Sequence, residues 1–233
     1  MASDATALKL SEIFESLQGE GASMGVPTMF VRLAQCNLHC TWCDTKYTWD
    51  FTNYDYEAEV SERPPEDVAG TVNASATRRV VLTGGEPLLQ QRALERFFAS
   101  LAADVVVEVE TNGTIAPTPP TLARVNQWNV SPKLSTAGDA ESLRLRLPVL
   151  LALRDAAAAY LKLVVRTDAD YDEAEALVAR LAWPKDRVLF MPEANDRDSL
   201  RARSLGVAEA ARKRGFRFSS RLHLELWGGR RGT

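Results

Sequence analysis

Six short apolar segments, most of them followed by a helical pattern, constrain the fold of this chain more than any other feature. The strand-like segments lie at residues 27–34, 79–85, 104–114, 127–133, 159–165 and 186–194. Helices are predicted at residues 87–101, 141–158, 170–183 and 196–215, with a break near Pro148 and an end at Gly215. Strands that alternate with helices form parallel βαβ units with right-handed crossovers. The pattern therefore predicts an α/β fold with about six parallel strands.

Polar motifs follow most of these strands at the same end. They are CxxxCxxC after 27–34, GGEP after 79–83, ETNGT after 104–109, SPK after 127–130 and MPEA after 187–190. Ligand sites of parallel architectures gather at the C-terminal ends of the strands. We therefore expect the five loops to surround one site.

Composition and charge narrow the class of protein. The formal net charge is -3 over 233 residues, which gives no sign of a nucleic-acid binder. No apolar run reaches the roughly 20 residues of a membrane-spanning helix, and the first residues lack the pattern of a signal peptide. We expect a cytoplasmic protein without membrane or nucleic-acid partners. We expect one domain over residues 1–233, with an irregular insertion near 46–78 and a C-terminal tail near 216–233.

All three cysteines of the chain, Cys36, Cys40 and Cys43, lie within eight residues. In a reducing compartment such thiols indicate metal or cluster binding rather than disulfides. A structural zinc site is one alternative, but such sites are closed by four ligands, and the nearby candidates are only His39 and Asp44. His39 lies between two of the thiols, where the short loop hinders its access to the same metal. A [4Fe–4S] cluster held by three cysteines leaves one iron open for a ligand.

CxxxCxxC followed downstream by GGEP resembles the radical S-adenosylmethionine (SAM) enzymes. The resemblance implies an abbreviated, incomplete TIM-like barrel with fewer helices than strands. It implies that the cysteines bind a [4Fe–4S] cluster, that the open iron chelates SAM, and that reduction yields a 5′-deoxyadenosyl radical. No side chain is then expected to perform the bond-breaking step. The residues that the resemblance places at SAM are Gly84, Gly85, Glu86, Ser131 and Lys133.

The flanking residues point to one family within this superfamily. FxSxQGEG, then FVRL, then CNLxCxxCDT, together with the tail SRLHLELWGGRRGT, resemble the 7-carboxy-7-deazaguanine synthases. The resemblance implies conversion of 6-carboxy-5,6,7,8-tetrahydropterin to 7-carboxy-7-deazaguanine, on the route to queuosine and related nucleosides. Hydrogen is removed from C6, the ring contracts and ammonia is lost. A homodimer, with flavodoxin or ferredoxin as electron donor, is also expected.

Five side chains are predicted to bind this substrate. An amide and a carboxylate, Gln18 and Glu20, suit the donor and acceptor edge of a 2-amino-4-oxo ring, and Glu110 adds an acceptor. Arg32 lies in mid-strand, where an unpaired charge is costly, and by resemblance it pairs with the substrate carboxylate. His223, by resemblance, folds back over the substrate.

A sixth residue, Thr45, has a separate predicted role. By resemblance, its hydroxyl oxygen binds a Mg²⁺ ion that also holds the substrate carboxylate, which suits a hard cation that needs few protein ligands.

Two other functions remain open from the sequence. A glycyl-radical-activating enzyme shares CxxxCxxC and GGEP but acts on a protein partner, and it has no need of QGEG or of Thr45. A zinc-binding module without enzymatic activity has no need of GGEP or of a row of loops at strand ends.

Overall fold

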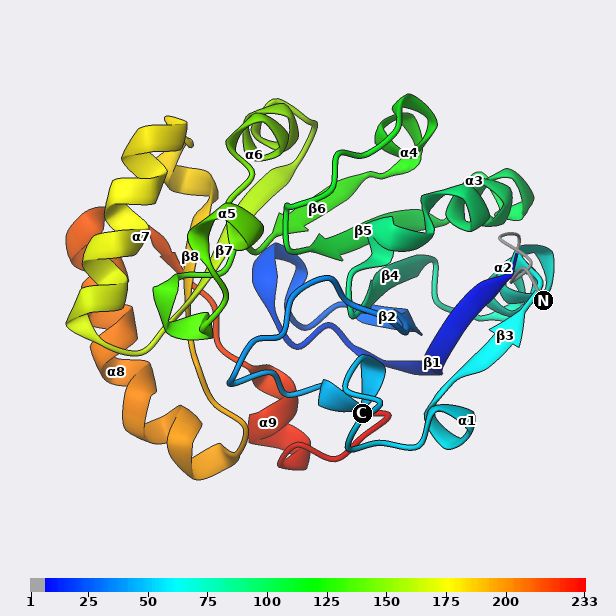
Figure 1. Cartoon of the computed structure of the whole chain (residues 1–233), viewed down its shortest axis with the longest axis horizontal. Coiled ribbons are helices and arrows are strands. Elements are labelled where there is room, and N and C mark those ends of the chain that lie inside the picture. Colours follow the sequence, from blue (N-terminus) through cyan, green and yellow to red (C-terminus); the bar gives the residue numbers. More distant parts are fainter. Residues whose placement is uncertain (1–6) are drawn as a thin grey trace.

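A computed structural model describes residues 7–233 as one continuous curved sheet with helices outside it (Figure 1). The strand order is β3-β1-β2-β4-β5-β6-β7-β8-β9. The strands, in chain order, are β1 (Leu8–Leu17), β2 (Pro27–Leu33), β3 (Ser61–Arg63), β4 (Arg79–Gly84), β5 (Val106–Thr111), β6 (Gln127–Val130), β7 (Ala159–Val165), β8 (Val188–Pro192) and β9 (Arg217–Phe218). Every neighbouring pair from β2 to β9 is parallel, whereas β1 runs antiparallel to both β2 and β3. The sheet is open between β3 and β9, so the predicted incomplete barrel is confirmed.

The helices lie mainly along the outer side of this sheet, where α3, α4, α6, α7 and α8 form an arc in Figure 1. The α-helices, in chain order, are α1 (Tyr56–Glu59), α2 (Pro65–Ala74), α3 (Gln91–Ser100), α4 (Pro119–Arg124), α5 (Glu141–Arg144), α6 (Leu147–Arg154), α7 (Asp168–Leu181), α8 (Arg197–Arg214) and α9 (Leu222–Trp227). The helices of eight or more residues are α2, α3, α6, α7 and α8, and the other four are single turns or little more. Residues 7–233 thus contain as many α-helices as strands, so the expected excess of strands holds only when the short helices are left out.

Local chemistry accounts for the ends of these helices. Thr167 begins α7 in a capping box with Asp170, and its side chain satisfies a backbone N–H group that the first turn leaves free. Gly215 ends α8 in the left-handed conformation that glycine adopts without strain, as predicted. The helix predicted over 141–158 divides into α5 and α6, and Pro148 lies in the first turn of α6, where no backbone N–H is needed.

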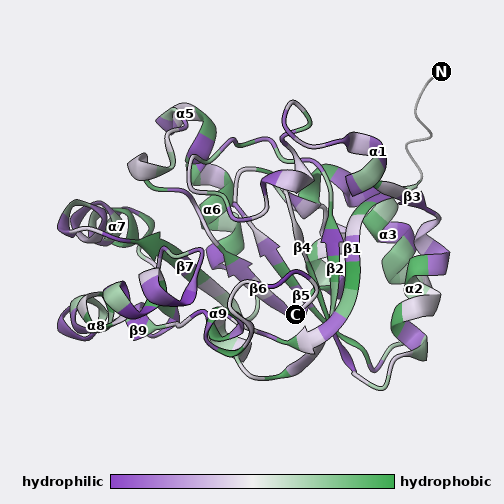
Figure 2. Ribbon diagram, turned by 90° about the horizontal axis from the view of Figure 1, so that it is seen from below, coloured by the Kyte–Doolittle hydropathy of each residue, from purple (hydrophilic) through white to green (hydrophobic). Residues whose placement is uncertain are grey.

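The hydrophobic core lies between the sheet and the outer helices. Its largest fully buried side chains include Trp128 of β6, Phe97 of α3 and Phe190 of β8. Burial of one such side chain contributes about 1.5–3 kcal/mol. Figure 2 shows hydrophobic and hydrophilic residues side by side in the central strands, for example in β5 and β6, and many hydrophilic residues on α7 and α8. Among the residues that the structure describes, no helix is long and apolar enough to cross a membrane.

The concave side of the sheet is covered by segments from both ends of the chain. The loop after β1 meets the tail, where Leu222 N donates to Gly19 O at 2.8 Å and Gly21 N donates to Ser219 Oγ at 2.8 Å. The segment after β2 and helix α9 lie on the same side (Figure 1). These segments enclose the C-terminal ends of the parallel strands.

Candidate functional site

A cavity of about 220 Å³ lies at the C-terminal ends of the parallel strands. All the predicted site residues except Glu86 line it. They are Gln18, Glu20, Arg32, Cys36, Cys40, Cys43, Thr45, Gly84, Gly85, Glu110, Ser131, Lys133 and His223. Residues that are up to about 200 positions apart in sequence therefore meet in one concave site.

The cysteine loop rests directly on the glycines that end β4. Gly85 N donates to Leu33 O at 3.0 Å, and Glu86 N donates to Gln35 O at 2.9 Å. A Cβ atom would lie 2.0 Å from Leu33 O at Gly84 and 1.9 Å from Gln35 O at Gly85. The two glycines of GGEP thus allow the backbone of the cysteine loop to approach the sheet.

The three thiols face the cavity in an environment that favours metal-bound thiolates. Burial raises the pKa of Cys36 to about 12 and that of Cys40 to about 11, so ionised sulfur there requires a compensating cation. Leu38 N donates to Cys36 Sγ at 3.5 Å, and Trp49 Nε1 donates to Cys43 Sγ at 3.3 Å. Hydrogen bonds to sulfur are among the features that tune iron–sulfur clusters. The donor set therefore fits a cluster.

The same loop does not resemble a site for a single ion. In the described part of the chain, no three His, Cys, Asp or Glu side chains are arranged to hold one metal ion. His39, the other candidate ligand, stacks on Trp49 with ring centroids 4.6 Å apart and does not line the cavity. A cluster differs, since each cysteine binds its own iron atom.

Glu86 lies behind the cavity wall and joins two of the loops. Its fully buried carboxylate accepts hydrogen bonds from Leu88 N at 3.0 Å, Thr111 Oγ1 at 2.9 Å and Asn112 N at 2.7 Å. Burial raises its pKa despite these donors. The Glu86 side chain therefore fixes the GGEP turn to the ETNGT loop and does not open into the cavity.

Ser131 and Lys133 lie on the wall near the cysteine loop. Lys133 Nζ donates to Ser131 Oγ at 3.2 Å and lies 5.6 Å from the centroid of the Trp42 ring. The SPK loop thus presents a hydroxyl and a cation on the side of the cavity that holds the thiols.

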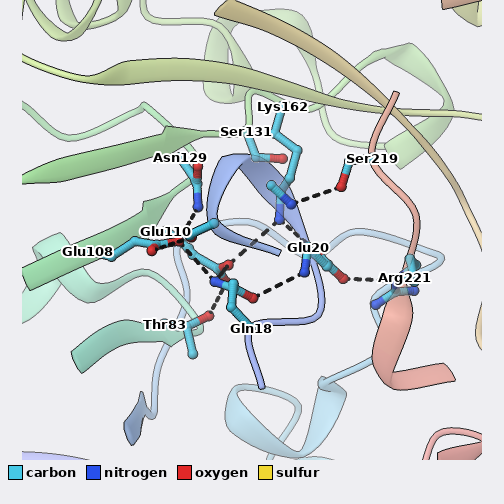
Figure 3. A network of polar contacts seen from close by, with 12 residues as sticks. Gln18, Glu20, Thr83, Glu108, Glu110, Asn129, Ser131, Lys162, Ser219 and Arg221 are labelled. Carbon is cyan, nitrogen blue, oxygen red and sulfur yellow. Dashed lines mark hydrogen bonds and ion pairs between the residues drawn. The ribbon is translucent and has the colours of Figure 1, made fainter. Parts of the chain in front are cut away.

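A polar network forms a further part of the cavity wall (Figure 3). Gln18 Nε2 donates to Glu108 Oε1 at 2.9 Å and to Glu110 Oε1 at 3.2 Å, while Thr83 Oγ1 donates to Glu110 Oε2 at 2.7 Å. The fully buried Glu108 also accepts from Asn129 Nδ2 at 2.5 Å. These bonds fix the orientation of Gln18 and Glu110.

Glu20 lies between two cations in this wall. Its carboxylate accepts hydrogen bonds from Lys162 Nζ at 2.5 Å and from Arg221 Nε at 2.8 Å. Burial opposes ionisation, but Lys162 and Arg221 outweigh it and hold the pKa of Glu20 well below its usual range. Arg221 also donates to Ala194 O and to Asp44 Oδ2. This arginine therefore joins the tail to the QGEG, MPEA and CDT segments.

Arg32 lines the cavity from β2, with its guanidinium near Glu12 of β1. Arg32 Nε donates to Glu12 Oε2 at 2.9 Å, and Tyr47 Oη donates to the same oxygen at 3.0 Å. Arg231 Nε donates to Glu12 Oε1 at 2.9 Å from the tail. The carboxylate of Glu12 thus compensates the positive charge of Arg32, for which the sequence alone indicated no partner within the protein.

Thr45 and His223 complete the predicted set. Thr45 Oγ1 lies 3.6 Å from Cys43 Sγ. The His223 ring packs on Gly19, where a Cβ would lie 2.2 Å from His223 Nδ1, and burial lowers the pKa of this histidine. The tail histidine therefore lies beside the QGEG loop and lines the cavity.

Lys162, Arg221 and Glu108 are site or supporting residues that the sequence reasoning missed. Lys162 stands in the apolar run AYLKLVV, and a lone charge in a buried strand was the available signal, as it was for Arg32. Glu108 stands likewise in VVVEVE. Nothing comparable marks Arg221, since arginines are frequent in the tail.

Comparison with known proteins gives consistent findings. The family model described as "Radical SAM superfamily" matches residues 31–224. The chain is 40% identical over 226 residues to a 7-carboxy-7-deazaguanine synthase of Pyrobaculum aerophilum, with 97% of each chain covered. It is 35% identical to the protein of the same name from Halobacterium salinarum, with 96% of this chain and 92% of that protein covered.

Solved structures agree with this result. QueE from Escherichia coli is similar, with a TM-score of 0.69 and 26% identity over 96% of this chain and 100% of that one. Streptococcus suis SuiB, at 13% identity and a TM-score of 0.55, shares the fold alone over 84% of this chain and 48% of its own.

Proposed function

The chain belongs to the 7-carboxy-7-deazaguanine synthase family of radical SAM enzymes, and from this we infer that it forms 7-carboxy-7-deazaguanine from 6-carboxy-5,6,7,8-tetrahydropterin. The reaction is a radical ring contraction with loss of ammonia, in the biosynthesis of 7-deazapurines. A [4Fe–4S] cluster, SAM and Mg²⁺ are its cofactors. The observation that carries the inference is the convergence of the family's motifs on one cavity.

We propose that Cys36, Cys40 and Cys43 hold the cluster, and that Gly84, Gly85, Ser131 and Lys133 lie at SAM, with Glu86 supporting the turn. When bound, the cluster and SAM supply the radical that removes hydrogen from C6 of the substrate. The protein supports this chemistry by placement. The glycines let the cysteine loop lie against β4, and Ser131 and Lys133 provide polar groups on the wall near that loop.

The substrate is proposed to lie between this side and the polar wall. Arg32 would pair with its carboxylate, because a guanidinium matches a carboxylate through two hydrogen bonds. Thr45 would supply the protein oxygen to Mg²⁺ next to that carboxylate. Both residues line the cavity.

The ring edge of the substrate is proposed to meet Gln18, Glu20 and Glu110, with His223 above it. The hydrogen bonds of Gln18 and Glu110 within the wall hold these groups in fixed positions before binding. Such preorganisation reduces the entropy lost on binding. The tail would also exclude water from the reacting ring, since Arg221 ties it to Glu20.

We propose further that flavodoxin or ferredoxin supplies the electron and that the protein is a cytoplasmic homodimer. Residues 1–233 are proposed to form one radical SAM domain, with an insertion near 46–78 and a tail near 216–233. The single continuous sheet supports this division. The relatives described above carry the synthase name, which favours this function over a glycyl-radical activase or a zinc module.

Anaerobic reconstitution tests the proposal. Protein loaded with iron and sulfide, then given SAM, a reductant, Mg²⁺ and the carboxytetrahydropterin, should form 7-carboxy-7-deazaguanine, detected by mass spectrometry. Cys40→Ala should lose both iron and product, whereas Gly70→Ala, at an open position of α2, should retain both. A fully loaded cluster without deazaguanine product would overturn the proposal.

A further inference from the structure

Lys162 is a buried lysine of β7 whose ammonium group lies in the cavity wall (Figure 3). Its side chain is only 6% exposed, and Nζ lies 2.5 Å from Glu20 Oε2 and 3.9 Å from Glu110 Oε1. Only the first distance is that of a hydrogen bond. Among residues 7–233, Glu20 is thus the one hydrogen-bond acceptor of this ammonium, and two of its three N–H donors are left for a ligand.

Deprotonation of Lys162 would remove one of these N–H donors, but the surroundings of the ammonium group oppose it. Burial lowers the pKa of Lys162, but Glu110 and Glu20 outweigh burial and raise it above its ordinary value. The group is therefore a cationic donor at neutral pH. Because buried donors without acceptors are costly, an acceptor atom on a bound ligand would be favourable here.

The neighbouring Glu110 is a hydrogen-bond acceptor and so complements the donor Lys162. Its carboxylate is held by Gln18 Nε2 at 3.2 Å and Thr83 Oγ1 at 2.7 Å, so its remaining acceptor capacity has a defined direction. Glu20 differs, because both of its oxygens already bind cations. The wall thus presents a donor, Lys162, beside an acceptor, Glu110.

A 2-amino-4-oxo ring presents the matching pair, since N–H donors and a carbonyl acceptor lie along one edge. We propose that Lys162 is a specificity-determining residue that donates a hydrogen bond to the ring carbonyl oxygen of the substrate, beside an N–H group accepted by Glu110. This inference rests on the proposed function and adds a residue to it. A 4-amino ring would direct N–H donors at the ammonium, so the wall should reject it.

Binding of two unreactive rings to the cluster-loaded protein tests the assignment. 6-Carboxypterin and 2,4-diaminopteridine-6-carboxylate differ at position 4 and at N3, which carries a hydrogen only in the 4-oxo ring, and neither carries a hydrogen at C6. Anaerobic calorimetry in the presence of SAM and Mg²⁺ should show that the wild type prefers the 4-oxo ring by about 10- to 100-fold. Lys162→Met should lower this preference by about 10-fold and leave only the part due to the N3 hydrogen, and Lys162→Arg should restore part of what is lost.

Lys9→Met is the matched control, because Lys9 of β1 pairs with Glu62 outside the cavity. It should keep the wild-type preference. Since Lys162→Met removes the ammonium group next to Glu20 and Glu110 and leaves only the Glu20–Arg221 ion pair, thermal unfolding is measured alongside. The double variant Lys162→Met/Glu20→Gln removes one of those carboxylate charges and should show the same loss of preference.

Two results would overturn the assignment, namely a wild type without preference for the 4-oxo ring or a folded Lys162→Met that retains that preference in full. Product formation by the wild type is measured separately. If the wild type makes 7-carboxy-7-deazaguanine, these results refute the role of Lys162 alone. If it makes no product and binds neither ring, the role of Lys162 fails together with the proposed function.

Discussion

Replacement of Gly85 by alanine should separate the cysteine loop from the sheet. The added Cβ would lie 1.9 Å from Gln35 O, 2.5 Å from Gln35 C and 3.0 Å from Cys36 N, all of them backbone atoms. No side-chain rotation relieves such contacts, so the loop must move by roughly 1 Å to reach even a tight contact. That movement stretches the hydrogen bonds from Gly85 N to Leu33 O and from Glu86 N to Gln35 O.

The expected magnitude follows from these two effects. Overpacking in a close-packed region costs about 1–3 kcal/mol. Weakening of two backbone hydrogen bonds costs about 1 kcal/mol more. We therefore expect Gly85→Ala to lower the free energy of unfolding by about 2–4 kcal/mol and to reduce the iron bound per chain, because Cys36 follows directly on the displaced carbonyl.

Gly70→Ala provides the matched control. Gly70 lies in α2, and a Cβ there meets no atom within 4 Å, so alanine should stabilise the helix by about 0.5–1 kcal/mol without changing iron content. The assay is anaerobic urea unfolding of cluster-free protein, followed by iron and sulfide analysis after reconstitution. The reasoning is refuted if Gly85→Ala unfolds within about 0.5 kcal/mol of the wild type and loads a full cluster.

Three further predictions concern the cavity. Thr45→Ala should retain the cluster spectrum but change the Mg²⁺ dependence of turnover, and an unaltered Mg²⁺ titration would exclude Thr45 as a ligand. Arg221→Met should lower the free energy of unfolding by about 3–5 kcal/mol, because it removes a nearly buried cation that pairs with Glu20 and Asp44. Arg201→Met, at an exposed ion pair, should lower it by less than about 1 kcal/mol, and equal losses in urea unfolding would contradict this. The pKa of Glu20 is lower in the folded than in the unfolded protein, so its ion pairs stabilise the fold above pH 4.5 and lose this effect as the pH falls further. The stability difference between the wild type and Glu20→Gln should accordingly shrink below pH 4.5, and a constant difference would contradict the assignment.

Six of the seven parallel strands were predictable because each is an apolar run, and five of these runs are followed by a distinct polar motif, whereas β9 has only two residues. Strand β1 was not predictable. Its register against β2 shifts between Leu10 and Glu12, so the alternation of apolar and polar residues that identifies a half-buried strand is interrupted. Its acidic side chains also pair with distant residues, such as Glu12 with Arg32 and Arg231.

Some features of the candidate site were likewise predictable from the sequence, and others were not. Motif residues converge on one cavity because loops at the ends of parallel strands meet at one edge of a sheet. Partners within that site depend on side-chain geometry, which sequence spacing does not contain. Thus GGEP marked Glu86 as a cavity residue, whereas its carboxylate is turned inward to Thr111 and Asn112. Lys162 had the same signal as Arg32, a lone charge in an apolar strand, and the argument used for Arg32 applied to it equally.

The contact between the QGEG loop and the tail has a consequence for how the enzyme is made. The hydrogen bond from Gly21 N to Ser219 Oγ spans 198 residues, and that from Arg221 Nε to Glu20 spans 201. At ordinary rates of translation, the ribosome adds that length in about 10–40 s. During this interval the cysteine loop already exists on the growing polypeptide while the cover over it has not been synthesised. Nascent protein therefore passes through a stage in which the thiols are accessible, and the cavity closes only after residues 219–221 have been made.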